Sequence, residues 1–407
     1  MQNNKKFIRD SFVFRMKKLK ILFISWYYPP QIGGVETIAK IIAEELAKKG
    51  MQITVLTSSN KKSIEKHHNL KIIRSPLMKP SNNSINFLAY FKSILKEGFD
   101  IVHSHNLSCQ FNPKKSLSII RVCNLLKVPL IEHAHNAQLK TPEKTREIIL
   151  SDIKIICVSN FVKKRYIELG VNPNNLKVIY NPVDGRLFDP KKVDKRKAQI
   201  LRKNISPFNL PIIFFPGRVI RISKIEIGEQ KQFKTVVEAL HKLNNQGIKY
   251  VFLIPGLNHQ PNTTKKSEKK GKGIIKDYLT NSGVKAYIFK KNIKIEDMPL
   301  AYYISDIVCM PSLNETFGMV FAESQAMEKP IIAAKSGAAK ELIQNNKTGF
   351  LVSPRAVDEV ANHLEKLICN PELRKNMGTM GRKRILKMFS KENSIKQIIK
   401  LYSENLE

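Results

Sequence analysis

Short apolar runs rich in β-branched residues alternate with amphipathic stretches along the first half of the chain. These runs predict β-strands at ILFIS (21–25), ITVLT (53–57), KIIRS (71–75), DIVHSH (100–105), PLIEHAH (129–135), KIICVS (154–159) and KVIYNP (177–182). Between the first two, residues 36–50 place apolar side chains at helical spacing and end at a glycine. Apolar strands joined by helices are typical of parallel sheets that are buried on both faces.

The same pattern starts again in the second half of the chain. Strands are predicted at IIFFPG (212–217), YVFLIPG (250–256), AYIFK (286–290), DIVCMPS (306–312), PIIAAKSG (330–337) and GFLVS (349–353). The chain therefore predicts an α/β fold with two doubly wound, Rossmann-like domains that face each other across a cleft. Ligands of such sheets bind at the carboxyl ends of the strands.

We place the domain boundaries where the pattern changes. Residues 1–16 are a basic N-terminal extension, and residues 17–185 form the first Rossmann-like domain. Residues 186–210 lie in a polar, basic stretch with prolines, which is typical of a linker. Residues 211–388 form the second Rossmann-like domain, and residues 389–407 form a C-terminal helix that we expect to pack back on the first domain.

The composition narrows the class of protein. With 407 residues, of which 42% are hydrophobic and 26% charged, the chain fits a globular protein of two or three domains. Its net charge of +36 leaves nucleic acids, anionic membranes and phosphorylated small molecules open as ligands. We find no helix-turn-helix, RNA-recognition signature or platform of interleaved aromatic and basic residues, so a nucleic-acid-binding protein is less favoured. The lysine-rich run at residues 258–272 is interpreted as a solvated loop.

The cellular location is inferred from cysteines and hydropathy. The five cysteines include no C-x-x-C pair, and Cys157 and Cys309 lie in apolar runs, which is typical of reduced thiols in a cytosolic protein. No run approaches the roughly 20 apolar residues of a membrane span, and the N-terminus lacks the features of a signal peptide. We expect a cytoplasmic protein, with attachment to the inner face of the cytoplasmic membrane left open.

Glycines and basic residues follow several of the predicted strands. Gly33 and Gly34 precede a helix, where N–H groups and the helix dipole favour an anion, although a plain tight turn fits equally well. Arg218 directly follows the strand at 212–217, and Lys231 opens the next predicted helix. Guanidinium and ammonium groups at such junctions suit a phosphate, although most lysines of this chain are expected to be solvated.

Two pairs of histidines end predicted strands of the first half. His103 and His105 close DIVHSH, and His133 and His135 close PLIEHAH. The pairs have the character of zinc ligands, but no Asp, Glu or Cys completes a set, so we expect no metal. The alternatives are one histidine that makes a polar contact or carries a proton, or four structural histidines.

The segment LNETFGMVFAES (313–324) contains two glutamates after a predicted strand. Glu315 falls in the loop, and Glu323 in the helix that follows Gly318. Because a glycine lets the N–H groups of the helix end approach a ligand, a phosphate fits there while each carboxylate accepts hydroxyl groups. This combination fits a sugar nucleotide. A capping acid followed by a solvated acid is the alternative.

Taken together, these segments resemble the retaining glycosyltransferases of the GT-B fold, in the large family 4 group. The likeness runs from about residue 20 to the C-terminus. It depends on the order of PPQIGGVE, DIVHSHN, PLIEHAHN, VSNFVKKR, VIYNPVD, PGR with KQFKTVVEAL, PSLNETFGMVFAESQAMEKPII and SGAAKELIQNNKTGFLV. The paired glutamates followed by Pro-Ile-Ile and Gly-Phe-Leu-Val are the most specific part.

The resemblance implies a role for each matching residue. Residues 17–185 would bind the acceptor and residues 211–388 the nucleotide-sugar donor. In the donor domain, Glu315 would contact the transferred sugar, and Glu323 would hold the ribose hydroxyls. The remaining catalytic and donor-binding positions are Arg218 and Lys231 on the diphosphate, with Gly34, Thr316, Phe317, Gly318 and Met319 around the phosphates and the sugar.

Three further positions concern the active-site histidine and the acceptor. His135 best matches the family's active-site histidine, with His105 as the alternate, and Gly33 would lie near the acceptor. The family usually has Lys-Gly where this chain has Lys231 and Gln232, at a longer spacing from the preceding arginine. Lys224 is therefore an alternative phosphate lysine. No D-x-D triplet occurs, which agrees with chemistry that uses no metal.

We therefore expect a retaining, hexosyl-type glycosyltransferase that uses a nucleoside-diphosphate sugar and needs no cofactor, metal or nucleic acid. A glycan or lipid-linked acceptor of cell-surface polysaccharide, lipopolysaccharide or glycolipid synthesis is expected, since basic faces favour anionic membranes. The alternatives are a GT-B hydrolase or epimerase of sugar nucleotides, a basic nucleic-acid-binding protein, or a non-catalytic partner of a membrane enzyme. The sequence leaves the sugar, the nucleotide, the linkage and the oligomeric state open.

Overall fold

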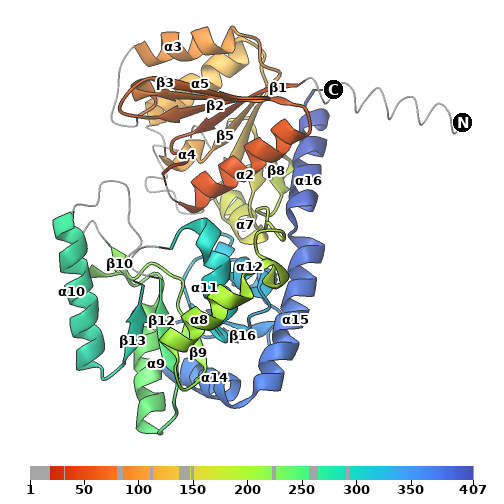
Figure 1. The fold of residues 1–407 in the computed structure, drawn as a ribbon. Helices are drawn as coiled ribbons and strands as arrows, with labels where there is room; N and C mark the ends of the chain where they lie inside the picture. Colours follow the sequence, from red (N-terminus) through yellow and green to blue (C-terminus); the bar gives the residue numbers. More distant parts are fainter. Residues whose placement is uncertain are drawn as a thin grey trace, which may run out of the picture. The chain divides into compact units, whose positions relative to one another are not determined.

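The computed structural model describes residues 19–31, 33–79, 86–110, 113–136, 147, 151–221, 226–255, 265–289 and 293–406 (Figure 1). The chain forms two compact units. The first contains Met1–Pro182 and Glu392–Glu407, and the second contains Val183–Lys391. Both units have the α/β architecture that the alternating pattern predicts.

An eight-stranded sheet forms the centre of the first unit. Its order is β3-β4-β2-β1-β5-β6-β7-β8, and every neighbouring pair is parallel except the antiparallel β3 and β4. The strands are β1 (Lys20–Ser25), β2 (Gln52–Ser58), β3 (Ser63–His67), β4 (Leu70–Ser75), β5 (Ile101–His105), β6 (Leu130–Ala134), β7 (Lys154–Cys157) and β8 (Leu176–Val178). The exposed β3 was not predicted, because its polar sequence SIEKH carries no apolar run.

Helices pack against this sheet through apolar stripes. In α2, the buried Ile38, Ile42 and Leu46 recur every four residues and so share one helix face. The described helices of this unit are α2 (Gly34–Lys48), α3 (Asn86–Leu95), α4 (Leu107–Gln110), α5 (Pro113–Leu125), α7 (Asn160–Glu168) and α16 (Lys391–Glu404), with 3₁₀ turns at Pro76–Met78 and Pro173–Asn175.

A six-stranded parallel sheet forms the centre of the second unit, in the order β13-β12-β9-β14-β15-β16. Its strands are β9 (Ile212–Phe214), β12 (Val251–Ile254), β13 (Ala286–Ile288), β14 (Ile307–Cys309), β15 (Ile331–Ala334) and β16 (Gly349–Val352). A short antiparallel pair, β10 (Ile220–Arg221) and β11 (Glu226–Ile227), follows β9.

The helices of the second unit precede, join or follow these strands. They are α8 (Lys195–Ile205), α9 (Phe233–Asn245), α10 (Lys265–Asn281), α11 (Met298–Ile304), α12 (Met319–Ala326), α13 (Ala339–Leu342), α14 (Val357–Cys369) and α15 (Pro371–Met388), with 3₁₀ turns at Pro190–Lys192 and Ile295–Asp297. The prediction of a loop at 258–272 was wrong from Lys265 onward, where α10 begins. Lysine and glutamate favour helices, so this charged run is compatible with one. The predicted extension 1–16 and Lys224 lie outside the described residues.

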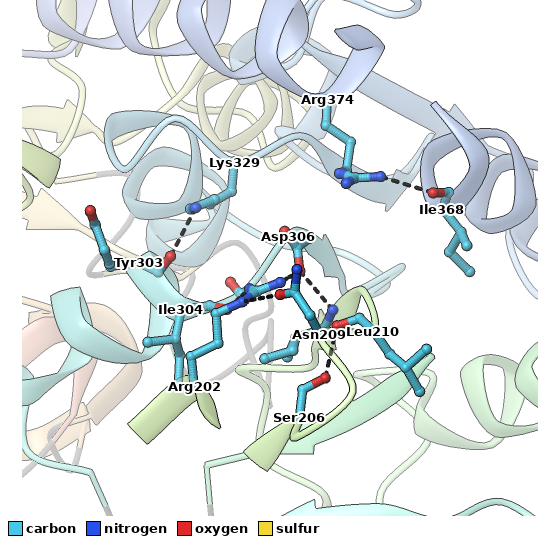
Figure 2. Close-up of polar contacts among 12 residues, drawn as sticks. Arg202, Ser206, Asn209, Leu210, Tyr303, Ile304, Asp306, Lys329, Ile368 and Arg374 are labelled. Carbon is cyan, nitrogen blue, oxygen red and sulfur yellow. Dashed lines mark hydrogen bonds and ion pairs between the residues drawn. The ribbon is translucent and has the colours of Figure 1, made fainter. Parts of the chain in front are cut away.

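The segment 186–210, which we predicted as a linker, contains α8 and belongs to the second unit. Arg202 of α8 donates to the carbonyl of Ile304 at 2.5 Å and pairs with Asp306 at 2.9 Å (Figure 2). Asp306 also accepts from the backbone N–H of Ile212 at 2.8 Å, at the start of β9. One carboxylate therefore ties α8 to the sheet.

The last residues of the chain, 392–407, belong to the first unit. Tyr402 of α16 is fully buried, and its hydroxyl lies 2.5 Å from His103 Nδ1 in β5. Ser394 of the same helix donates to the carbonyl of Tyr180 at 2.8 Å. The first unit is thus built from both ends of the chain.

Glu132 is a buried acid in the first unit. It lies in β6 and is 1% exposed. Its Oε2 accepts from Ser104 Oγ at 2.5 Å, and within the described residues its Oε1 has no hydrogen-bond partner. Burial raises the pKa of Glu132 to about 7, and hydrogen bonds from Ser104, Leu107 and Ser108 oppose that rise only in part. The carboxyl is therefore partly protonated near neutral pH.

We expect Glu132→Gln to gain stability relative to the wild type as the pH rises from about 5 to 8. Because the pKa of the folded state lies above the unfolded value of 4.5, the carboxyl contributes fully below pH 4.5, and its contribution is lost as the pH rises through about 7. The change is on the order of 3 kcal/mol. Urea unfolding at both pH values, followed by fluorescence of the single tryptophan, Trp26 in the first unit, measures it.

The exposed Glu168→Gln is the control for the loss of one carboxylate in the same unit. Its stability difference from the wild type is expected to change little between the two pH values. Parallel pH dependences for the wild type and Glu132→Gln would contradict the role given to burial.

Candidate functional site

The loop between β14 and α12 holds the first predicted glutamate, and its main chain is fixed on two sides. The N–H of Leu313 donates to the carbonyl of Gln230 at 2.8 Å. On the other side, the N–H of Ala338 donates to the carbonyl of Glu315 at 2.8 Å. These bonds connect the loops that follow β9, β14 and β15, which are neighbours in the parallel sheet. Loops at the carboxyl ends of three strands therefore meet at Glu315.

A glycine makes this close contact possible. Gly337 has φ +59°, and a Cβ at this position would lie 2.3 Å from the carbonyl oxygen and 2.7 Å from the nitrogen of Glu315. Next to it, Ser336 Oγ accepts from the N–H of Asn314 at 2.9 Å. The turn at 336–338 thus sets the position of Glu315 through its backbone.

The side chain of Glu315 forms an ion pair with Lys231, which donates its Nζ to Glu315 Oε1. Both side chains are only partly exposed, at 14% for Glu315 and 24% for Lys231. The pair is therefore less screened by water than an ion pair on the open surface. The structure brings together a predicted sugar-contacting acid and a predicted phosphate cation.

Lys231 is positioned by an unusual residue at the start of α9. Gln232, the N-cap of α9, has φ 55° and ψ 39°, in the left-handed region where glycine is most easily accommodated. Its side chain donates to the carbonyl of Glu229 at 2.6 Å and accepts from Thr235 Oγ1 at 3.1 Å. These bonds offset the strain of a left-handed glutamine, and they account for glutamine at a position where the family usually has glycine.

The helix α12 begins at Gly318, which has φ +91°. A Cβ there would lie 2.4 Å from the ring of Phe321. Its N-cap, a glycine, offers no side-chain cap, and its first turn contains no acidic residue. Its N-terminal end therefore keeps the positive potential that favours an anion. The predicted positions Thr316, Phe317 and Met319 belong to the same turn.

Glu323 lies in the second turn of α12 and is buried. Its Oε2 accepts from the hydroxyl of Tyr302 at 3.0 Å. Burial raises the pKa of Glu323 to about 7, with the Tyr302 hydrogen bond acting in the opposite direction. Unlike Glu315, this acid is balanced by a hydroxyl donor instead of a cation.

Arg218 lies at the same edge of the sheet, just after β9, and its side chain is exposed. The strands β9 and β14 are parallel neighbours, so the segments that follow them leave the sheet on the same side. Arg218 therefore belongs to the sheet edge that carries Glu315.

The predicted residues of the first unit form a second group. Gly33 is the N-cap of α2, and a Cβ at Gly33 would lie 2.0 Å from the carboxylate of Glu36, whereas Gly34 has open space around it. A carboxylate thus already lies beside this helix end. His105 Nδ1 lies 2.9 Å from His135 Nε2, and the backbone N–H of His135 donates to Asn106 Oδ1 at 2.8 Å.

Several residues that shape the site were not singled out from the sequence. The segment SGAAKEL carried a usable signal for Gly337, because a glycine directly after a strand often marks a tight turn. Nothing in the local sequence indicates that Tyr302 reaches Glu323, or that a backbone carbonyl at Gln230 holds the loop. These contacts arise only when separate strands are placed side by side.

Each half of the chain matches a known protein family. The family described as Glycosyltransferase Family 4 matches residues 32–186, and Glycosyl transferases group 1 matches residues 211–384, so that the two together account for most of the chain. The chain belongs to the glycosyltransferases of this group 1, family 4 type. Its fold is the GT-B fold, with two α/β units that each contain a mainly parallel sheet.

The glycosyltransferase is similar to proteins from several bacteria. It is 25% identical over 404 residues to a D-inositol 3-phosphate glycosyltransferase of Corynebacterium jeikeium, with 91% of this chain and 92% of that protein covered. It is 23% identical over 252 residues to the capsular polysaccharide biosynthesis glycosyltransferase CapM of Staphylococcus aureus, with 61% of each covered. Anabaena HepE, solved in complex with UDP-glucose, matches with a TM-score of 0.73 and 19% identity over 95% of this chain and 100% of HepE.

No helix in the described part of the glycosyltransferase is both long and apolar enough to cross a bilayer.

We expect Gly337→Ala to destabilise the second unit more than Gly247→Ala does. Both glycines lie in this unit with positive φ, but a Cβ at Gly247 meets nothing within 4 Å, whereas at Gly337 it meets the main chain of Glu315. Gly247→Ala therefore carries only the left-handed strain of about 1 kcal/mol, and Gly337→Ala adds a clash of about 1–3 kcal/mol. Scanning calorimetry compares the two, and equal losses would contradict the backbone contact as the positioning element.

Proposed function

We propose that this glycosyltransferase moves a hexose-type sugar from a nucleoside-diphosphate sugar to an acceptor hydroxyl, with retention of the anomeric configuration. The observation that carries the proposal is the Lys231–Glu315 pair, which lies at the carboxyl edge of the second sheet beside an uncapped helix N-terminus. One sheet edge thus presents a cation and a helix end for phosphates, and a carboxylate for sugar hydroxyls. The complex of Anabaena HepE with UDP-glucose supports this class of donor.

The leaving diphosphate gains negative charge as the glycosidic bond breaks. Lys231, Arg218 and the N-terminal end of α12 are suited to stabilise that charge, because cations and N–H groups act most strongly where charge develops. Backbone N–H groups of Phe317, Gly318 and Met319 are in the turn that would face the phosphates or the sugar. This arrangement supplies the charge that a divalent ion supplies in other phosphate sites, so we propose that transfer proceeds without a metal.

In this proposal, donor binding replaces Glu315 with the diphosphate as the partner of Lys231. In the structure the ammonium group pairs with Glu315. When the diphosphate takes over Lys231, the carboxylate of Glu315 becomes available to accept from sugar hydroxyls. The pair therefore keeps two charged groups compensated until the donor supplies a phosphate for one and hydroxyls for the other.

The two glutamates are proposed to hold different parts of the donor. Glu315 would contact the transferred sugar, and Glu323 would accept from the ribose hydroxyls. Tyr302 already donates to Glu323 Oε2, so it fixes the orientation of that carboxyl before a nucleotide arrives. Glu323 acts as a hydroxyl acceptor in this proposal and not as an acid or a base.

Retention follows, in this proposal, from attack on the same face as the leaving group. The acceptor oxygen forms its bond to the anomeric carbon as the bond to the diphosphate breaks, and the acceptor proton passes to a phosphate oxygen. His135, whose ring lies against His105, is proposed as the active-site histidine, and Gly33 as a position near the acceptor. The carboxylate of Glu36 beside Gly33 disfavours a phosphate at that helix end, so the diphosphate is assigned to the second unit.

We expect a nucleoside-diphosphate sugar to raise the melting temperature of the wild type and to do so much less in Lys231→Ala. At 100 times its dissociation constant a ligand adds about 2.7 kcal/mol of stability. A thermal-shift screen over nucleotide sugars identifies the donor, and Lys234→Ala, an exposed lysine of the same helix, is the matched control. Loss of the shift in both variants would indicate a general charge effect.

With the donor identified, Glu315→Gln and Lys231→Ala are expected to lower the transfer rate by roughly hundredfold to thousandfold. The free-energy cost of the double variant is expected to be much smaller than the sum of the costs of the two single variants, because the residues act as a pair. Glu238→Gln, an exposed acid of α9, is the control. Full transfer in both single variants would refute the mechanism, and steady release of free sugar or an epimer without transfer would favour a hydrolase or an epimerase.

A membrane-linked acceptor is proposed for the transferase, in the synthesis of a cell-surface glycan. The net charge of +36 favours an anionic surface by roughly 1 kcal/mol for each Lys or Arg close to it. The similarity to CapM of Staphylococcus aureus supports a polysaccharide pathway. The protein would then work at the inner face of the cytoplasmic membrane as a peripheral protein.

We expect the protein to float with vesicles that contain an anionic lipid at low salt, and to be released as the salt concentration rises, because exposed charges are screened beyond about 10 Å at 0.1 M salt. Vesicles of zwitterionic lipid alone are the control. Absence of binding to anionic vesicles at low salt would contradict the membrane proposal and leave the transfer chemistry untouched.

A further inference from the structure

Four histidines of the first unit lie against one another on one face of two neighbouring strands. His103 and His105 are two apart in β5, as are His133 and His135 at the end of β6, so each pair points to one side of the sheet. The parallel register sets His105 opposite His133. Ring centroids are 4.4–5.3 Å apart, and the side chains are 0–7% exposed.

The hydrogen bonds of the cluster fix where each ring carries its proton. His103 Nδ1 lies 2.5 Å from the Tyr402 hydroxyl, and His103 Nε2 lies 3.2 Å from His133 Nδ1. If His133 donates from Nδ1, His103 accepts at Nε2 and donates from Nδ1 to Tyr402. The opposite assignment would bury an N–H on His133 Nε2 without an acceptor, which is the costlier arrangement.

The same reasoning applies to the second pair. His105 Nδ1 lies 2.9 Å from His135 Nε2, and His105 Nε2 has no partner in the described part of the chain. His105 therefore donates from Nδ1 and keeps a lone pair on Nε2. His133 Nε2 likewise lacks a partner among the described residues. Two buried imidazole lone pairs on adjacent strands are thus left without a donor.

Burial also keeps these rings in the form that binds metals. It lowers the pKa of His103 and of His135 to about 3, and it lowers the pKa of His105 and His133 well below the usual value, with neighbouring imidazoles adding to the effect in His103, His105 and His133. Neutral imidazole is a ligand for zinc, copper, nickel and iron. A proton therefore does not compete for the lone pairs at neutral pH.

We propose that His103, His105 and His133 bind one divalent transition metal ion of the zinc type through imidazole nitrogens. One ligand atom from each lies within 4.8 Å of the other two. In a tetrahedral zinc site the nitrogens are about 3.4 Å apart, given Zn–N distances of about 2.0–2.1 Å. The rings must therefore close by about an ångström on binding, which is a matter of side-chain rotation on fixed strands.

The contacts around the three rings suit this site. His105 Nε2 and His133 Nε2 offer lone pairs directly. When His103 Nε2 binds the metal, His133 Nδ1 loses its acceptor, and the metal–nitrogen bonds offset that loss. His103 still donates from Nδ1 to Tyr402, and His105 still donates from Nδ1 to His135. Such outer partners orient the imidazole rings of metal sites. The site was not expected from the sequence, because alternation along single strands does not show that two strands pair in this register.

This inference goes beyond the proposed transfer reaction, which uses no metal. His135, the proposed active-site histidine, is an outer partner here and not a ligand. The metal would hold His105, and through it the ring of His135, in one orientation. Metal binding and sugar transfer are therefore measured separately.

The test uses the untagged full-length protein, stripped with a chelator and then titrated with Zn²⁺ and Co²⁺. We expect one equivalent of metal per chain by equilibrium dialysis and elemental analysis. The cobalt form is expected to show visible d–d absorption without the near-ultraviolet bands of thiolate ligands, which separates the histidines from the cysteines. Thiolate bands, or no stoichiometric binding, would overturn the proposal.

His133→Gln is expected to weaken binding by at least about tenfold. His67→Gln with His68→Gln, two exposed histidines of the same unit, is the matched control and is expected to bind as the wild type does. Trp26 fluorescence reports whether His133→Gln folds, and the cobalt spectrum of the wild type decides the question if it does not. Equal affinity in the folded variant would refute the site.

Discussion

The proposed donor site depends on one close approach between two backbones. The strands β14 and β15 are parallel neighbours, so the loops that follow them lie side by side. Gly337 has no side chain to separate its turn from Glu315, and the N–H of Ala338 holds the Glu315 carbonyl at 2.8 Å. The carboxylate of Glu315 reaches Lys231 from this fixed main chain. The Lys231–Glu315 ion pair therefore depends on the absence of a side chain at Gly337.

Three acidic side chains of this strongly basic protein have two kinds of partner, a cation or a hydroxyl donor. Glu315, which is partly exposed, forms an ion pair with Lys231. Glu323 and Glu132 are buried, and each accepts from a hydroxyl, of Tyr302 and Ser104 respectively. Burial favours the neutral form of a carboxyl and a cation favours the ionised form. Burial raises the pKa of both Glu132 and Glu323 to about 7, so these two acids titrate near neutral pH.

The alternation of apolar runs and helices predicted both sheets, because a parallel strand buried on both faces has a continuous apolar sequence. It did not predict β3 or α10, whose sequences are rich in polar and charged residues. At the site, Glu315 and Lys231 were identified from motifs in the sequence. Their contact could not be predicted, because it depends on three loops that meet in space. The left-handed Gln232 shows how a departure from a motif is accommodated by two side-chain hydrogen bonds.

The construction of the first unit from both ends of the chain has a consequence for its synthesis. Tyr402 fills the interior beside His103, and residues 392–406 are made only after the whole of the second unit. Until residues 392–406 leave the ribosome, His103 lacks its hydroxyl partner, and the buried histidines lack the packing that Tyr402 supplies. The second unit, whose residues 183–391 are continuous, has no such requirement. The unit that begins first is therefore the one completed last.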